Sequence, residues 1–121
     1  MADCFFCKTN DYIFENELAK GRFDGFPVSE GHMEFVTKRC VPTFFETTAE
    51  EKIAIFELID KAKKFLDDKY HPDGYNIGMN CGTAAGQSIM HVHVHLIPRY
   101  NGDVENPRGG VRGVIPSKQN Y

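Results

Sequence analysis

Polar and apolar positions alternate strictly over residues 91–96, where histidine takes positions 91, 93 and 95 and valine or leucine takes positions 92, 94 and 96. Successive side chains of a β-strand point to opposite faces, so the pattern predicts a strand with His91, His93 and His95 on one face. Residues two apart lie roughly 6.5–7 Å apart along a strand, which lets two rings grip one small anionic group. The apolar opposite face explains the valines but not the histidines, so the segment is also a candidate site.

A different spacing follows Thr48, where apolar residues recur every three or four positions, as on one face of an α-helix. Thr48 and Glu51 match the capping box that begins many helices. Pro72 and Gly74 are typical of a helix end. We therefore predict one helix from about Thr48 to about Tyr70, with these residues on its apolar face: Ile55, Leu58, Ile59, Ala62, Phe65 and Leu66.

Short segments rich in apolar and β-branched residues stand on both sides of this helix and predict the remaining strands. Turn-forming residues separate them at positions 25–31 and 82–86. The predicted strands before and after the helix are residues 12–16, 18–24, 32–37 and 75–80. Strands that surround a single helix, rather than alternating with helices, favour an α+β fold with a mainly antiparallel sheet.

The composition fits one globular domain over residues 1–121, because 121 residues with 41% hydrophobic positions suffice for one core and not for two. Residues 101–121 are rich in glycine, proline and asparagine, and we expect them to form an irregular covering segment. The net charge of −3 comes from acidic and basic residues mixed along the chain, which provides no basic surface for nucleic acid.

The segment after Met1 does not resemble a secretion signal, and no stretch approaches the ~20 apolar residues of a membrane-spanning helix. We therefore expect a cytoplasmic protein without a membrane partner. Four cysteines would stay reduced in the cytosol, where they are better candidates for metal binding than for disulfide bonds.

Imidazole is a good nucleophile towards phosphorus and titrates near neutrality, so adjacent rings can divide nucleophilic and acid–base roles. Backbone N–H groups, an amide and a hydroxyl in Gly86, Gln87 and Ser88 could bind phosphate oxygens just before the histidine strand. Phosphoryl chemistry is the interpretation that these residues favour. A hydrolase with catalytic zinc on the three histidines is the alternative, because imidazole is also a favoured zinc ligand.

Four blocks of the sequence resemble the histidine triad (HIT) family. They are residues 24–32, 75–80, 85–88 and 91–99, and the resemblance extends in order from about Cys4 to Arg112. It implies an antiparallel five-stranded sheet with one long helix, usually in a homodimer. It also implies a purine nucleotide substrate, with nucleotidyl transfer or hydrolysis as the activity.

The resemblance assigns the catalytic roles residue by residue. His93, the middle histidine, would attack the α-phosphorus and form a nucleotidyl-imidazole intermediate that water hydrolyses. His95 would contact the phosphate oxygens and help to protonate the leaving group. His32 matches a further family histidine near the site.

The resemblance also implies the residues that bind the nucleotide. Asp24 matches the acid that binds ribose, and its two oxygens suit the 2′ and 3′ hydroxyls. The phosphate would be held by Ser88, Gln87 and Asn80. Aromatic residues that could form the base pocket are Phe5, Phe6 and Phe23, although phenylalanine more often packs in a core.

The cysteines form a second constellation. Cys4 and Cys7 have the short spacing of two thiolates on one metal, and many bacterial members of the family add two histidines to such a pair. Here Cys40 replaces the first of these histidines, and His91 matches the second. We therefore predict a structural Zn²⁺ in a Cys3His site, with no organic cofactor. An N-terminal turn without metal and a redox pair are the alternatives.

The leaving group is open within the family. Asn80 resembles the phosphoramidase branch, whereas Arg99, Arg108 and Arg112 could hold the second phosphate of a dinucleoside polyphosphate. A nucleotide-binding scaffold with little turnover is the alternative from another functional class. The intact His93 and His95 favour retained chemistry.

Overall fold

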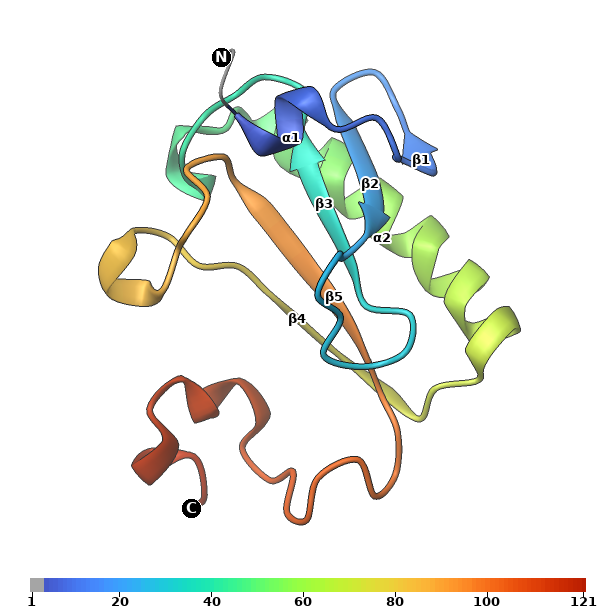
Figure 1. The fold of residues 1–121 in the computed structure, drawn as a ribbon, viewed down its shortest axis with the longest axis vertical. Coiled ribbons are helices and arrows are strands. Elements are labelled where there is room, and N and C mark those ends of the chain that lie inside the picture. The colour runs from blue at the N-terminus through green and yellow to red at the C-terminus, as the bar shows by residue number, and fades with distance from the viewer. Residues whose placement is uncertain (1–3) are drawn as a thin grey trace.

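The computed structural model describes residues 4–121, and its five strands form one antiparallel sheet in the order β1-β2-β3-β5-β4 (Figure 1). Residues 1–3 lie outside the described residues. They are part of the N-terminal segment in which the sequence shows no secretion-signal pattern. The strands are β1 Phe14–Glu15, β2 Ala19–Phe23, β3 Met33–Thr37, β4 Gly74–Gly78 and β5 His93–Arg99. The predicted α+β fold with an antiparallel sheet is therefore confirmed.

The histidine strand begins later than the alternating pattern predicts. β5 starts at His93, and the N–H of Val92 donates to the carbonyl of Val41, which does not belong to β3. From His93 onward β5 pairs with β3 on one side and β4 on the other. The prediction of three histidines on one strand face was therefore wrong for His91, which precedes the strand.

The long helix α2, Ala49–Tyr70, has the predicted bounds and the predicted capping box. The N–H of Glu51 donates to Thr48 Oγ1 at 3.1 Å, and the N–H of Thr48 donates to Glu51 Oε1 at 2.8 Å. His71 ends the helix in the left-handed conformation with φ 52°, whereas Gly74 already begins β4. The short helices are α1 Phe5–Lys8 and the 3-10 helices Phe44–Glu46, Thr83–Ala85, Gly110–Val114 and Pro116–Lys118.

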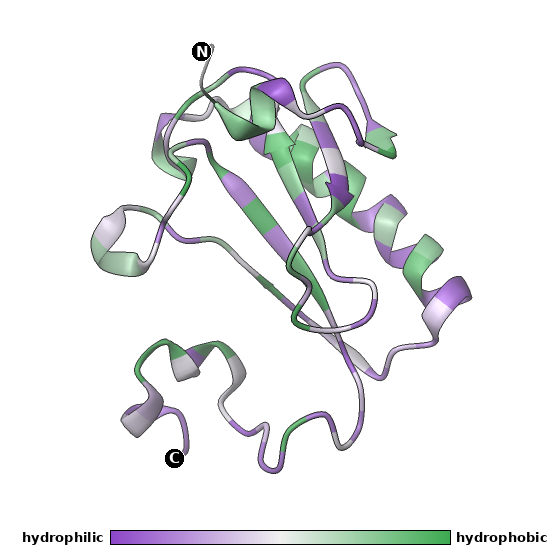
Figure 2. Cartoon of the chain, viewed as in Figure 1, coloured by the Kyte–Doolittle hydropathy of each residue, from purple (hydrophilic) through white to green (hydrophobic). Residues whose placement is uncertain are grey.

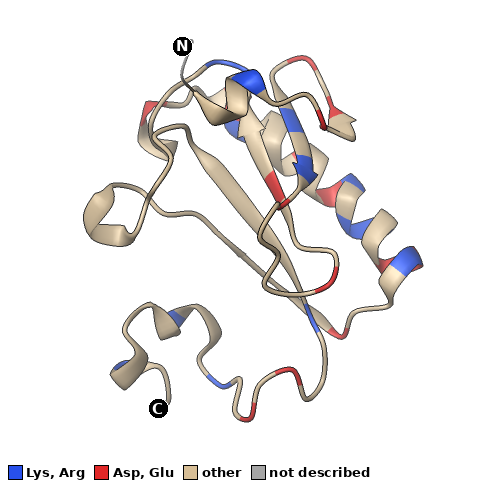
Figure 3. Cartoon of the chain, in the orientation of Figure 1, with Lys and Arg blue, Asp and Glu red and all other residues tan. Residues whose placement is uncertain are grey.

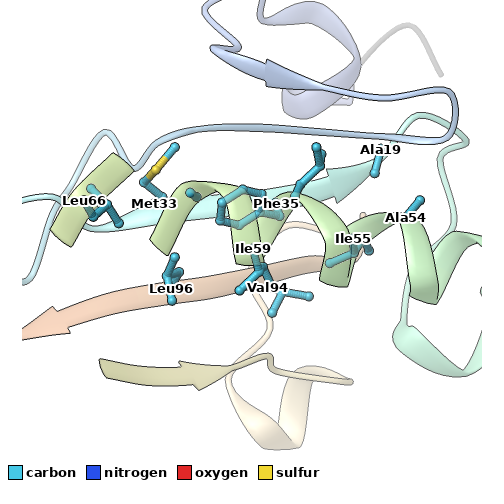
Figure 4. Packing of buried hydrophobic residues seen from close by; sticks show 11 residues of the cluster. Ala19, Met33, Phe35, Ala54, Ile55, Ile59, Leu66, Val94 and Leu96 are labelled. Atoms are coloured by element: carbon cyan, nitrogen blue, oxygen red, sulfur yellow. The ribbon is translucent and has the colours of Figure 1, made fainter. Parts of the chain in front are cut away.

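The core lies between α2 and one face of the sheet. Apolar and polar residues alternate along α2 and β5, as expected of elements with one buried face (Figure 2). The apolar side chains that meet in the core include Ala19, Met33, Phe35, Ala54, Ile55, Ile59, Leu66, Val94 and Leu96 (Figure 4). The opposite face of the sheet carries the polar members of the same strands, including both histidines of β5.

One glycine of β2 is required by this packing. Gly21 pairs with Phe35 of β3, and a Cβ at Gly21 would overlap the Phe35 ring. We expect Gly21→Ala to lower the free energy of unfolding by about 1–3 kcal/mol, because overpacking displaces a buried ring. Gly25→Ala is the matched control, since nothing lies within 4 Å of its added Cβ. Equal urea midpoints for the two variants would contradict this account.

In the described segment after β5, the regular elements are two short 3-10 helices. Residues of this segment, among them Asp103 and Pro107, line a cavity of about 400 Å³ together with Asn76, Ile97 and Arg99. Within residues 4–121, no helix combines the length and the apolar character needed to cross a membrane.

Candidate functional site

His93 occupies the start of β5 and is buried beside Phe6 of α1, with the ring centroids 5.0 Å apart. Its Nδ1 lies 2.8 Å from the carbonyl oxygen of His91. A carbonyl only accepts hydrogen bonds, so Nδ1 carries the proton and Nε2 keeps its lone pair. The fold therefore holds His93 in the tautomer that a nucleophilic imidazole needs.

His32 and His95 form a hydrogen-bonded pair on the same face. His32 Nδ1 accepts from the backbone N–H of Val28 at 3.1 Å, so the proton of the neutral ring is on Nε2. That Nε2–H donates to His95 Nδ1 at 2.9 Å. The remaining nitrogen of His95, Nε2, is then an N–H donor. With the His93 and His95 centroids 5.2 Å apart, a nucleophile and a donor lie side by side.

Asp24 lies against this pair. Its Oδ2 is 3.5 Å from His32 Nε2 and 3.6 Å from His95 Nδ1, while its Oδ1 accepts from the N–H of Phe26. Burial lowers the pKa of His95 to about 4, assisted by His93 and His32 and opposed by Asp24. The His95 ring is therefore neutral near neutrality.

Asp24, His32 and His95 are close enough together to surround a metal ion. However, His32 Nδ1 already accepts a backbone hydrogen bond, so its Nε2 carries a proton and offers no lone pair. This group is therefore a hydrogen-bonded triplet and not a metal site.

The predicted zinc ligands converge at the other end of the histidine segment. One donor atom each from Cys4, Cys7, Cys40 and His91 lies within 4.8 Å of the others. His91 Nδ1 is 3.1 Å from Cys4 Sγ and 3.7 Å from Cys7 Sγ. Tetrahedral zinc with bonds of about 2.0–2.3 Å needs ligand atoms spaced in this way. The four residues therefore fit a closed Cys3His zinc site.

The surroundings of His91 also suit a zinc ligand. Its Nε2 lies 2.8 Å from the carbonyl of Thr37, which fixes the proton on Nε2 and directs the Nδ1 lone pair at the cysteines. Burial, with the neighbouring Cys4 and Cys7 thiols, raises the pKa of Cys40 to about 12. A bound cation would favour ionisation of such crowded thiols.

The alternative of catalytic zinc on three histidines does not fit this geometry. His91 directs its free nitrogen at the cysteines, while His93 uses Nδ1 to donate to the carbonyl of His91. Within residues 4–121, two groups of side chains are close enough to share a metal ion. One contains His91 and the other contains His95, and neither contains two of the three histidines.

The three predicted phosphate ligands near the loop before β5 differ in their exposure to solvent. Ser88 is exposed, and Asn80 is partly exposed just beyond β4. Gln87 is buried: its Nε2 donates to the carbonyls of Pro42 and Ile89, and its Oε1 accepts from the N–H of Gly82. The amide of Gln87 thus has no free donor for a phosphate, and the expectation that it binds one was wrong.

The three phenylalanines predicted to form a base pocket lie in different environments. Phe23 packs against the core and Phe65, and it also lines a cavity with Asp24 and His32, so its place in a base pocket stays a prediction. Phe6 is fully buried against His91 and His93 and supports their rings. Phe5 is half exposed beside Arg22 and is available to a ligand.

Charge is distributed unevenly around the site. No lysine, arginine, aspartate or glutamate occurs over residues 74–98, which include β4, the loop and most of β5 (Figure 3). Arg99 is bound to Asp103 at 2.8 Å and to Asn76 at 2.6 Å, so its guanidinium is already satisfied. A phosphate near His93 would therefore be met by neutral donors and imidazoles.

Two residues near the site were not identified as candidates from the sequence. Arg22 of β2 and Glu34 of β3 are buried on the same face as His95. Their signal is a charged residue that shares a strand face with neighbouring candidate site residues and is nevertheless buried, which is rarely found without a partner.

Comparison with known proteins agrees with the motifs. A family model described as HIT domain matches residues 7–102. An uncharacterized HIT-like protein of Methanocaldococcus jannaschii is 36% identical over 108 residues, which cover 84% of this chain and 83% of that protein. The bis(5'-adenosyl)-triphosphatase of Dictyostelium discoideum is 30% identical over 99 residues, which cover 82% of this chain and 66% of that protein.

A solved structure shares the fold. A zinc-bound histidine triad family protein of Mycobacterium smegmatis is 29% identical with a TM-score of 0.76, covering 84% of this chain and 78% of that chain. The histidine segment, the antiparallel sheet with one long helix and the match over residues 7–102 lead to one conclusion: this chain is a member of the HIT domain family.

Proposed function

We propose that the protein is a nucleotidyl hydrolase or transferase that cleaves a nucleoside phosphoramidate or a dinucleoside polyphosphate at the α-phosphate. The observation that carries the proposal is the tautomer of His93, whose Nδ1–H is engaged by the His91 carbonyl at 2.8 Å. The free lone pair on Nε2 lies beside the Nε2–H donor of His95. The activity named for the Dictyostelium relative supports the same class of substrate.

In the proposed reaction, His93 Nε2 forms a bond to the α-phosphorus while the bond from phosphorus to the leaving group breaks. His95 donates from Nε2 to a phosphate oxygen. The negative charge of the bound phosphate favours a proton on His95, which the ring passes to the leaving group. Water then forms the new P–O bond and gives a proton to His95, while the N–P bond breaks and His93 regains its lone pair.

Zinc has a structural role in this proposal. Cys4, Cys7, Cys40 and His91 would hold it, and the ion would supply the positive charge that keeps the thiolates together. Because His91 belongs to that centre, His93 and His95 remain free for the chemistry.

Asp24 is proposed to bind the ribose hydroxyls. A carboxylate offers about four lone-pair positions, so the hydrogen bond from the Phe26 N–H leaves acceptors free. Asp24→Ala should weaken the binding of AMP by about 10-fold and that of dAMP by less, because dAMP lacks the 2′ hydroxyl. Calorimetric titration of both nucleotides measures the difference. Equal losses would exclude the ribose role.

A homodimer, which the family resemblance implies, is also proposed. β4 is an edge strand of the described sheet, and Ile77 on it is half exposed, which suits pairing with a second copy. Sedimentation velocity tests this part of the proposal.

The activity is tested by AMP release from an adenosine phosphoramidate and, in parallel, from diadenosine triphosphate and tetraphosphate. Turnover of either class supports the proposal, and the preferred class identifies the leaving group. If the zinc-loaded protein binds AMP but turns over none of these substrates, the scaffold function replaces the proposed one.

A further inference from the structure

A row of polar side chains crosses the sheet beside the histidines. Arg22 of β2 pairs with Glu34 of β3, and Glu34 pairs in turn with His95 of β5. Directly paired residues of neighbouring strands project from the same face, so these three side chains are neighbours. Arg22 is 6% exposed and Glu34 is 5% exposed, and neither has a role in the proposed reaction. Two charged residues are thus buried next to a proposed catalytic histidine without being used by it.

The stability of the fold does not account for Glu34. Arg22 donates to both carboxylate oxygens of Asp11, at 2.7 and 2.8 Å, so its charge already has a partner. Its Nη1 donates in addition to Oε2 of Glu34. Taking a further carboxylate out of water is costly, and apolar residues can often replace a buried ion pair without loss of stability. A ligand therefore explains Glu34 better than the fold does.

The second carboxylate oxygen of Glu34 is free. Oε2 is held by Arg22, and no donor among the described residues forms a hydrogen bond to Oε1. In the part of the chain that the structure describes, each fully buried side-chain nitrogen or oxygen has a hydrogen-bond partner. Because Oε1 has none, it must reach solvent, although the Glu34 side chain is only 7% exposed. Arg22 thus fixes a carboxylate whose open oxygen can accept hydrogen bonds from a ligand.

An open aromatic ring borders the same ion pair. Phe5 is 45% exposed, and the Arg22 guanidinium lies over its ring, 5.2 Å from the centroid. Phe5 packs in turn on Phe6, whose ring lies beside that of His93. Nucleobases stack on aromatic rings and on arginine guanidinium planes. Aromatic side chains therefore extend from the proposed nucleophile to the guanidinium that holds Glu34.

The ion pair lies within reach of the base of a bound nucleotide. In the proposed function the phosphate lies at His93 and His95 and the ribose at Asp24. Arg22 precedes Asp24 by two residues, roughly 7 Å along the strand, and Glu34 is about 5 Å across the sheet from its partner His95. These spacings match the size of one nucleotide, whose base and phosphate are joined to the same ribose. Arg22 and Glu34 are therefore placed to meet the base.

We propose that Glu34 recognises the base of the bound nucleotide and that the preferred base is guanine. The inference rests on the proposed function and specifies its substrate. A carboxylate only accepts hydrogen bonds, so it selects a base edge that offers donors. Guanine presents N1–H and its 2-amino group side by side, whereas adenine presents the acceptor N1 beside its 6-amino group. Guanine is the one common base with two adjacent donors, so it complements Glu34 best.

The experiment titrates GMP, IMP and AMP into the zinc-loaded protein by calorimetry. The titrations are done at pH 8, because burial raises the pKa of Glu34 to about 7 and the carboxylate must be ionised. IMP keeps the N1–H of GMP and lacks the 2-amino group. We expect GMP to bind about 10-fold or more tightly than AMP, with IMP between them, since a bidentate contact discriminates bases to this extent. Equal Kd values for GMP and AMP would overturn the inference.

A variant separates a base contact from a structural role. Glu34→Gln keeps an acceptor for Arg22 and offers adenine a carbonyl beside an amide donor. We expect it to bind GMP about 10-fold more weakly than the wild type and to bind AMP no more weakly. Glu57→Gln, on the exposed face of α2, is the control and should keep the wild-type values. Equal losses of GMP and AMP affinity in Glu34→Gln would show that Glu34 acts through the fold, and would overturn the inference.

Failure of the proposed function gives a different result. If GMP is preferred and neither guanosine nor adenosine phosphoramidates or dinucleoside polyphosphates are turned over, the proposed chemistry fails and the role of Glu34 stands. If none of the three nucleotides binds to the wild type, nucleotide binding and the role of Glu34 are excluded together.

Discussion

Replacing His93 with alanine is expected to abolish turnover, lowering kcat/KM by at least ~10³-fold, while leaving the fold and the zinc in place. The loss is large because the imidazole Nε2 is the atom that forms the covalent intermediate, and no other described side chain presents a free lone pair at that position. Alanine leaves the His91 carbonyl without its partner but does not touch the Nδ1 of His91 that faces the cysteines.

The measurement compares AMP release with metal content and melting temperature for the same preparations. His71→Asn is the matched control, because His71 lies outside the site and asparagine tolerates its left-handed conformation. The control should retain wild-type turnover. A His93→Ala protein that has lost its zinc would show that the chemical site and the metal centre are not separate, and one that keeps full turnover would exclude His93 as the nucleophile.

The fold could be predicted from local patterns because each major element is periodic. The capping box at Thr48 and the apolar spacing after it define α2, and the bounds agree with the structure. The alternation over residues 91–96 predicts β5 from His93 onward. The alternation of residue types does not show where the hydrogen bonds to the neighbouring strand begin. The predicted strand therefore started at His91, two residues before the observed start of β5.

The candidate site could be predicted only where residue type and spacing carry the chemistry. The ligand set of Cys4, Cys7, Cys40 and His91 depends on side-chain identity, and the structure brings these four together. Gln87 could not be placed from the sequence, because one of its side-chain hydrogen bonds is donated to the carbonyl of Pro42, which is 45 positions away along the chain. Phe23 and Glu34 depend on which face of the sheet each presents, and this follows from strand register, not from composition.

Loss of zinc is expected to destabilise the fold, because its four ligands come from three separate segments of the chain. Cys4 and Cys7 belong to the α1 segment, Cys40 follows β3 and His91 precedes β5. Metal that binds only the folded state adds its binding free energy to stability. We expect Cys4→Ser, or chelation of the wild type, to cost at least ~3 kcal/mol and to lower the melting temperature by about 10 °C or more.

Cys81→Ser is the control for this change, because Cys81 is a cysteine outside the cluster. It should keep one zinc per chain by elemental analysis and a melting temperature close to that of the wild type. Chelation should have little further effect on Cys4→Ser, since both changes remove the same constraint. If Cys4→Ser lost its zinc without a fall in melting temperature, the metal would be incidental to the fold, and the burial of His91 would then have to stabilise the start of β5 by packing alone.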